Sequence, residues 1–191
     1  MLIEFSIGNY KSFKDIVTFS MVAANLTSKN KKLDVTNTFN YKKSMNLLKA
    51  AAIYGSNASV ISSSKDTQAT EEIRVENYKL STTTEDTPSY FEIIFVIGGI
   101  RYRYGFELDK NSIHSEWLYR AKDREINLFL RTKEEISPKG PFSEGKGLES
   151  KTRPNALFLS VCAQWNGKIS QEILKWFKDC GVISGLNDFG Y

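Results

Sequence analysis

The chain has 191 residues, of which 41% are apolar and 25% are charged, and its formal net charge is +4. This length fits one domain, or one domain with an added lobe, and the composition is typical of a globular protein with a buried core. The mild positive charge permits a phosphate or nucleic-acid partner without requiring one, and no apolar run is long enough to span a bilayer. Because the N-terminus has no signal-peptide pattern, we expect a cytoplasmic protein with no membrane partner.

The cysteine and histidine content argues against several kinds of chemistry. Cys162 and Cys180 lie in apolar or helical surroundings without metal-ligand spacing, so we expect free thiols. The single histidine, His114, has no second histidine and no ligand cluster to work with. The sequence therefore predicts no metal site, no Ser-His-Asp triad and no catalytic residues of its own.

The N-terminal residues predict a β-hairpin. Residues 2–8 alternate apolar and polar side chains, residues 16–21 form the return strand, and Asn9-Tyr-Lys-Ser-Phe13 connects the two. The connection is either a loop held by its aromatic rings or a loop that contacts a nucleotide. In the second case Lys11 would contact a phosphate, and Asn9 and Ser12 would supply hydrogen-bonding groups. The spacing alone favours the structural interpretation.

Residues 25–44 are polar and rich in lysine, asparagine and threonine. This composition predicts an extended connection at the surface. A basic strip for nucleic acid is the alternative, but a solvated loop is the commoner meaning of such a segment.

A phosphate-binding loop begins after this connection. Ala50–Tyr54 predicts a short buried strand, and small residues follow it at positions 55–59. The complete pattern is Gly, four residues, then Gly-Lys-Ser or Gly-Lys-Thr. Val60–Ser62 stands where that second glycine, the lysine and the hydroxyl residue belong, and no helical periodicity follows it. The first five positions are Gly55, Ser56, Asn57, Ala58 and Ser59.

The middle of the chain predicts an antiparallel β meander, because successive β-prone segments are joined by short turns such as Gly98-Gly99. Arginines 101 and 103 with tyrosines 102 and 104 could form a base-stacking platform, although cross-strand pairing explains them more simply. The predicted strands are residues 72–80, 89–97, 100–108, 113–120 and 127–131.

The C-terminal third predicts helices. Residues 137–155 are an exposed loop, residues 156–164 are a buried helix or strand, and residues 169–179 form an amphipathic helix. The predicted fold is mixed α/β. It is one unit in three parts: residues 1–60 with the hairpin and the phosphate-loop strand, residues 72–131 with the meander, and residues 155–191 as a helical end. We expect Leu47, Leu48 and Ile53 in the core.

Three segments together resemble a known family. They are Ile-Gly-Asn-Tyr-Lys-Ser-Phe at 7–13, Ala-Ala-Ile-Tyr-Gly-Ser-Asn-Ala-Ser at 51–59, and Leu-Phe-Leu-Ser-Val-Cys-Ala-Gln-Trp-Asn at 157–166. The chain is similar to the N-terminal part of bacterial AAA-type ATPases of the ABC/SMC class, of the abortive-infection (phage-defence) and overcoming-lysogenisation-defect kind. In that family an N-terminal strand ends in Asn-Phe/Tyr-Arg/Lys-Ser-Phe, and the phosphate loop reads Gly-x-Asn-Ala-Ser-Gly-Lys-Ser.

The resemblance implies a P-loop NTPase fold, namely the N-terminal lobe of an ABC ATPase-like head with an antiparallel meander and a C-terminal helix. It implies ATP and Mg²⁺ as cofactors of the parent family. Asn9, Lys11 and Ser12 would line the nucleotide together with the loop at residues 55–59, and Gln164 would contact Mg²⁺. It also implies a homodimer through the ATPase head, since such heads build their sites across two subunits.

Two departures from the family pattern give a first hypothesis and two alternatives. First, the Gly-Lys-Ser with its helix is missing after Ser59. Second, the chain stops before a signature motif, a Walker B pair or a switch histidine. The first hypothesis is therefore an N-terminal fragment that binds ATP weakly or not at all. The first alternative is a non-enzymatic module that docks a protein or nucleic acid. The second is that the sequence skips a segment, which the Cα–Cα distance between Ser59 and Val60 would reveal, since a peptide bond gives about 3.8 Å.

Overall fold

The computed structural model describes residues 1–25, 31–42, 45–51 and 72–180. Most of these residues belong to one antiparallel sheet with two helices against one face, which confirms the predicted mixed α/β class. The strands are β1 (Leu2–Gly8), β2 (Val17–Ser20), β3 (Thr38–Lys42), β4 (Met45–Leu48), β5 (Ser89–Ile97), β6 (Ile100–Leu108), β7 (Ile113–Ala121), β8 (Glu125–Arg131) and β9 (Ile136–Pro138). The helices are α1 (Lys31–Thr36), α2 (Phe158–Gln164) and α3 (Lys168–Asp179), with short 3-10 turns at Thr82–Thr84, Ser143–Gly145 and Glu149–Lys151.

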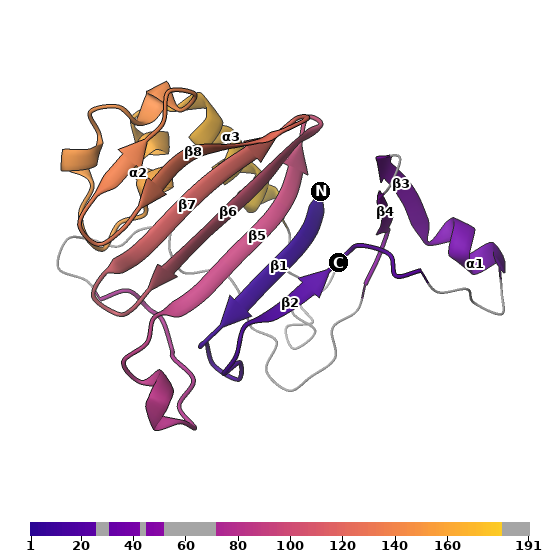
Figure 1. Cartoon of the computed structure of the whole chain (residues 1–191), viewed down its shortest axis with the longest axis horizontal. Coiled ribbons are helices and arrows are strands. Elements are labelled where there is room, and N and C mark those ends of the chain that lie inside the picture. The colour runs from indigo at the N-terminus through magenta and orange to yellow at the C-terminus, as the bar shows by residue number, and fades with distance from the viewer. Residues whose placement is uncertain (26–30, 43–44, 52–71, 181–191) are drawn as a thin grey trace, which may run out of the picture.

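The main sheet has seven strands in the order β2-β1-β5-β6-β7-β8-β9. All neighbours are antiparallel, so the N-terminal hairpin and the meander share one sheet (Figure 1). The Gly98-Gly99 turn between β5 and β6 has φ angles of 55° and 79°, the left-handed conformation that glycine adopts without steric cost. Six of the predicted strands, β1, β2, β5, β6, β7 and β8, are confirmed, with ends shifted by two residues or fewer.

The helical layer covers one face of this sheet (Figure 1). Its core contains Phe95, Phe129 and Phe158, each fully buried. The ring of Trp176 on α3 stacks on Phe95 with 4.3 Å between centroids. The segment 156–164, for which the sequence left helix and strand open, contains helix α2, and the amphipathic helix predicted at 169–179 is α3.

The β3–β4 hairpin packs against the opposite face of the sheet. Leu47 is completely buried with Ile3 and Val96, whereas Leu48 is half-buried. The prediction of a plain connection over residues 25–44 was therefore wrong, because α1 and β3 lie within it. Strand β3 pairs with β4, and Leu47 on β4 packs against Ile3 and Val96 of the main sheet. This long-range packing favours a strand that the polar composition of residues 25–44 does not predict.

Two further strand predictions need correction. Glu72–Leu80 is not a strand: Ile73 and Val75 are buried, as the alternation predicts, but the backbone bonds of this segment go to Lys110 and Lys11 at the end of the sheet instead of a neighbouring ladder. Ala50 and Ala51 are exposed and outside any strand, and the rest of the predicted strand Ala50–Tyr54, including Ile53, lies outside the described residues. The loop predicted at 137–155 starts inside β9.

Candidate functional site

The predicted nucleotide-contacting loop is a tight turn between β1 and β2. Tyr10 and Phe13 exchange both backbone hydrogen bonds at 2.9 Å. Lys11 has a φ of 49°, Ser12 is exposed, and Asn9 has a φ of 43°. Asparagine tolerates the left-handed region better than most side chains, which explains the residue at the start of the turn. The structure brings these three predicted contacts together at one corner of the sheet.

The Asn9 side chain holds the loop that precedes β5. Its amide donates to the carbonyl oxygens of Thr84 at 2.9 Å and Thr87 at 2.7 Å, and its Oδ1 accepts from the backbone N–H of Tyr78 at 3.1 Å. Ser89 Oγ donates to the Asn9 carbonyl. Asn9 is only 6% exposed, so its amide has a structural role here, and its contact with a nucleotide stays a prediction.

Replacing Asn9 with alanine should loosen this loop. The change removes the side-chain hydrogen bonds to Thr84, Thr87 and Tyr78 at a buried site and leaves alanine in a left-handed conformation, so we expect a loss of about 2 to 3 kcal/mol in unfolding free energy. Hydrogen exchange should quicken at residues 77–88 before it quickens in α2 and α3. Ser12→Ala, at an exposed position of the same turn, is the control and should leave both measurements unchanged; equal effects of the two variants would contradict the assigned role.

An apolar cluster ties the turn to the helical layer. Ile73, Val75, Leu108 and Ile113 are buried together with Leu157, and Tyr10 packs against them. The N–H of Lys11 donates to the carbonyl of Glu76 at 2.8 Å. The segment after residue 71 therefore returns to the turn that carries Asn9, Lys11 and Ser12.

The other predicted contacts lie elsewhere or outside the described residues. Gln164 is exposed at the last position of α2. Helix α2 packs over β7 and β8, and three strand spacings separate β1 from β7, which amounts to about 14 Å across the sheet. Residues 55–59 lie outside the described residues, as does the Ser59–Val60 bond, so neither the loop nor the skipped-segment alternative is tested.

A buried polar network that the sequence reasoning missed fixes α2 to the sheet. The Glu116 carboxylate on β7 is fully buried and accepts from the N–H groups of Phe158 at 2.6 Å and Leu159 at 3.0 Å, and from the Tyr104 hydroxyl at 3.0 Å. Burial raises the pKa of Glu116. The three hydrogen bonds and the positive charge of nearby Arg131 act in the opposite direction and lower it, but the pKa remains above its ordinary value. The sequence contains a signal for this network, because Glu116 shares a strand face with Leu118 and a charged residue stands there where an apolar one is expected.

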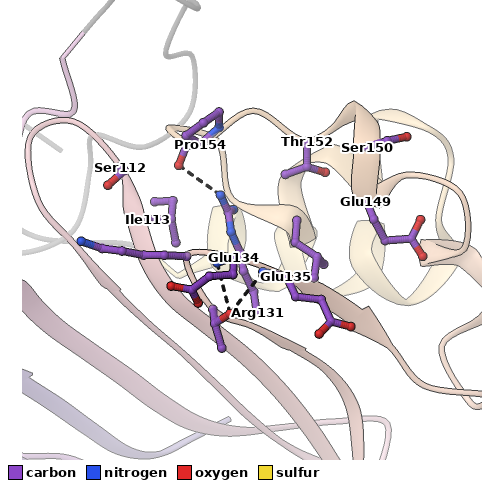
Figure 2. Close-up of a pocket in the computed structure, with 12 residues that line it drawn as sticks. Ser112, Ile113, Arg131, Glu134, Glu135, Glu149, Ser150, Thr152 and Pro154 are labelled. Carbon is purple, nitrogen blue, oxygen red and sulfur yellow. Dashed lines mark hydrogen bonds between the residues drawn. The ribbon is translucent and has the colours of Figure 1, made fainter.

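Arg131 completes the network and also lines a pocket. Its guanidinium lies 3.6 Å from Glu116 and donates to the carbonyl oxygens of Arg153, Pro154 and Ala156. Figure 2 shows the bond to Pro154 at the centre of the pocket. The guanidinium is therefore directed at backbone carbonyls of the connection to α2.

The pocket itself has a volume of about 570 Å³ and lies between the β8–β9 turn and residues 149–154. Glu134, Glu135 and Glu149 line it (Figure 2). Two cations, Arg131 and the exposed Lys133, also belong to the lining. This lining is net negative and repels phosphate groups. The pocket therefore does not fit a nucleotide triphosphate, and it does not coincide with any predicted contact.

The arginines of the meander pair with carboxylates on the face opposite the helices. Arg103 lies 2.8 Å from Glu125 and 3.5 Å from Glu92, and its guanidinium stacks on Tyr119 at 4.1 Å. Arg101 also contacts Glu125. These cross-strand contacts support the simpler interpretation of the aromatic and basic residues, since paired arginines are not directed at bases.

His114 pairs with Asp109 at the β6–β7 turn, and this pair makes a pH prediction. Partial burial raises the pKa of Asp109, but hydrogen bonds from His114 and from the N–H groups of Asn111 and Ser112 outweigh it, so the pKa lies below its ordinary value. A lowered carboxyl pKa stabilises the fold above the unfolded pKa, and this contribution disappears as pH falls through the folded value. Asp109→Ala should cost about 1 kcal/mol at pH 7, and urea unfolding should show the difference shrinking below about pH 4; a difference independent of pH would contradict this.

The described residues offer no other ligand set. Within them no group of three or more histidine, cysteine, aspartate or glutamate side chains could hold a metal ion, and both Cys162 and Cys180 are free. No helix in this part of the chain is long and apolar enough to cross a membrane.

Comparison with known proteins supplies the family. A family model described as "AAA domain, putative AbiEii toxin, Type IV TA system" matches residues 45–182, which is more than half of the chain. The chain belongs to this AAA-domain family. The match spans the small-residue loop at 55–59 as well as α2 of the AAA domain. No curated protein and no solved structure matches the chain.

Proposed function

We propose that this AAA domain is the nucleotide-binding part of an ATPase of the ABC/SMC class that acts in a toxin or abortive-infection system against phage. The observation that carries the proposal is the family match over residues 45–182, because it includes Gly55–Ser59, the start of a phosphate-binding loop. The turn at Asn9–Phe13 and the exposed Gln164 are the other expected contacts.

The chemistry of these residues suits a weak phosphate site. Backbone N–H groups of Gly55–Ser59 would bind phosphate oxygens, and Lys11 would add a positive charge from the neighbouring turn. Mg²⁺, when bound, neutralises phosphate charge, and Gln164 would supply an oxygen to it. Val60 and Ile61 occupy the positions of the glycine and the lysine that would make the strongest contacts.

Calorimetric titration with Mg-ATP tests this proposal. We expect a dissociation constant in the millimolar range, which corresponds to about −4 kcal/mol. Titration with Mg²⁺ alone is the control for ion binding. Micromolar binding by the unaltered chain would contradict the account of the incomplete loop, and the absence of any nucleotide effect at millimolar concentration would remove the nucleotide-binding role.

The alternative is an interaction module that docks a protein or nucleic acid without nucleotide chemistry. A gel-shift series with DNA and RNA at increasing salt separates the two functions, because phosphate contacts give a steep salt dependence. Since Arg101 and Arg103 are paired with carboxylates, we expect no tight shift at physiological salt. A homodimer through the ATPase head stays part of the proposal, and sedimentation with and without Mg-ATP measures it.

A further inference from the structure

The face of the main sheet opposite α2 and α3 is covered only in part. The β3–β4 hairpin packs on it at Ile3, Ile94 and Val96, next to β1 and the end of β5 (Figure 1). Within the described residues no other helix or strand packs there, and the side chains of β6, β7 and β8 on this side remain partly exposed. We call this surface the bare face, and its main side chains are Arg101, Arg103, Trp117, Tyr119, Glu125 and Leu130.

The large side chains of the bare face are held in fixed positions. The Trp117 indole lies over Gly105 on the neighbouring strand, because a Cβ at Gly105 would come within 2.4 Å of it. The indole N–H donates to Glu92 at 2.8 Å. Beside it, the Arg103 guanidinium stacks on the Tyr119 ring at 4.1 Å. A surface that is already ordered loses less conformational entropy when a partner binds.

The composition of the bare face is typical of a protein–protein interface. Tryptophan, tyrosine and arginine are enriched in such interfaces, and lysine is depleted. Strands β5–β8 contain no lysine, although lysines are frequent elsewhere in the chain. Leu130 is 40% exposed on β8 and is the ladder partner of Trp117 on β7. An exposed leucine therefore adjoins the fixed indole at the centre of the bare face.

The β3–β4 hairpin restricts how a second copy of the chain can lie on this face. It covers the end of β5 next to β1, so a face-to-face contact must centre on the strands farther from β1. The middle one of the three uncovered strands is β7. A two-fold axis along β7 places β6 of each copy over β8 of the other, and it keeps both hairpins away from the contact.

In this arrangement the facing side chains are complementary. Gly105, Trp117 and Leu130 occupy one row across β6, β7 and β8. Leu130 of one copy therefore lies over the indole that covers Gly105 of the other. Arg101 shares a row with Glu125, so β6 of one copy presents its two arginines to Glu125 of the second copy.

We propose that the bare face is a dimer interface, with a second copy of this chain as its partner. Contacts between Leu130 and Trp117 form the apolar centre, and pairs between the β6 arginines and Glu125 form the rim. The five strands β5 to β9 at about 4.8 Å spacing and seven residues at about 3.4 Å give roughly 580 Å² per copy. This area is at the lower limit for specific interfaces, so we expect a dissociation constant of about 10 to 100 µM.

A charge exchange between copies tests the interface. Arg103→Glu and Glu125→Arg each break the pair within one chain and place like charges opposite each other in a dimer of that variant. In an equimolar mixture, each altered side chain meets its opposite charge only on the other copy. Analytical ultracentrifugation should show at least about tenfold weaker self-association for each variant alone, and at least about tenfold tighter association for the mixture than for either variant.

Leu130→Glu tests the apolar centre, and Leu80→Glu, at an 85% exposed position outside the bare face, is the matched control. The first should weaken self-association at least about tenfold and the second should leave it unchanged. Circular dichroism checks that each variant folds. The proposal is overturned by a chain that stays monomeric at about 1 mM, by equal effects of the two leucine variants, or by a mixture that associates no better than its components. Those results would leave the bare face to a different protein partner.

The dimer is independent of the proposed nucleotide-binding function, because it uses none of residues 9–13 or 55–59. Sedimentation without nucleotide should therefore show the same dissociation constant as sedimentation with Mg-ATP. A dimer without any Mg-ATP binding would keep the interface and reject the nucleotide function. Mg-ATP binding by a chain that stays monomeric would do the reverse, and a dimer that forms only with Mg-ATP would also overturn this interface.

Discussion

Replacing Val60 with glycine and Ile61 with lysine should raise the affinity for Mg-ATP by about tenfold to a hundredfold, or about 1.4 to 2.8 kcal/mol. The double variant reads Gly-Ser-Asn-Ala-Ser-Gly-Lys-Ser from position 55 to 62, which is the complete phosphate-loop pattern. The lysine adds charge-assisted hydrogen bonds to the phosphates, and the glycine permits close approach of the backbone. Calorimetry of both chains under identical salt gives the difference directly.

The matched control is Val60→Gly/Ile61→Gln, which keeps the length and polarity of the new side chain without its charge. It should recover about half of the gain in binding free energy, since a neutral hydrogen bond is about half as strong as a charged one. If the lysine variant binds no better than the glutamine variant, residues 55–59 do not hold phosphate in this chain. A gain with Mg-ATP and none with Mg-AMP would place the new charge on the terminal phosphates.

Replacing Glu116 with glutamine should lower the unfolding free energy by about 3 to 5 kcal/mol, because it leaves the buried Arg131 charge without its partner. The variant also puts an amide donor against the N–H groups of Phe158 and Leu159 that the carboxylate accepts. Urea unfolding measures the loss, and hydrogen exchange should locate it at the start of α2.

Glu107→Gln is the matched control, since Glu107 is half-buried and accepts from Ser115 at the surface of β6. It should change stability by less than about 0.5 kcal/mol. Adding Arg131→Met to Glu116→Gln should recover part of the loss, because the unpaired cation is then gone. A loss below about 1 kcal/mol for Glu116→Gln would show that this network does not hold α2 to the sheet.

Local signals in the sequence were sufficient for the meander. Alternating side chains and the Gly98-Gly99 turn set the ends of β5 and β6, because strand pairing there depends on neighbours in sequence. The same alternation failed at Glu72–Leu80. Ile73 and Val75 are buried, as the alternation implies. However, the N–H of Ile73 donates to Lys110 and the carbonyl of Glu76 accepts from Lys11, both at the end of the sheet, and no local pattern distinguishes such bonds from a strand ladder.

The candidate site was predicted in part for a similar reason. The motif Asn-Tyr-Lys-Ser-Phe forms one compact turn. Both interpretations of the motif, a nucleotide-contacting loop and a purely structural loop, predict such a turn. That the Asn9 amide binds the carbonyls of Thr84 and Thr87 depends on a contact 75 residues away or more, which spacing cannot show. The Glu116–Arg131 pair likewise joins two strands and a distant helix, although a charged residue on an apolar face was visible in each strand.

Backbone amide NMR during a Mg-ATP titration tests whether residues 55–59 and the Asn9–Phe13 turn bind one nucleotide, since fast-exchange shifts report even millimolar binding. We expect the amides of Gly55–Ser59 and of Asn9–Phe13 to shift together with one common dissociation constant. Shifts confined to the acidic pocket around Arg131 and Glu149, or unaltered spectra at both segments, would contradict this expectation.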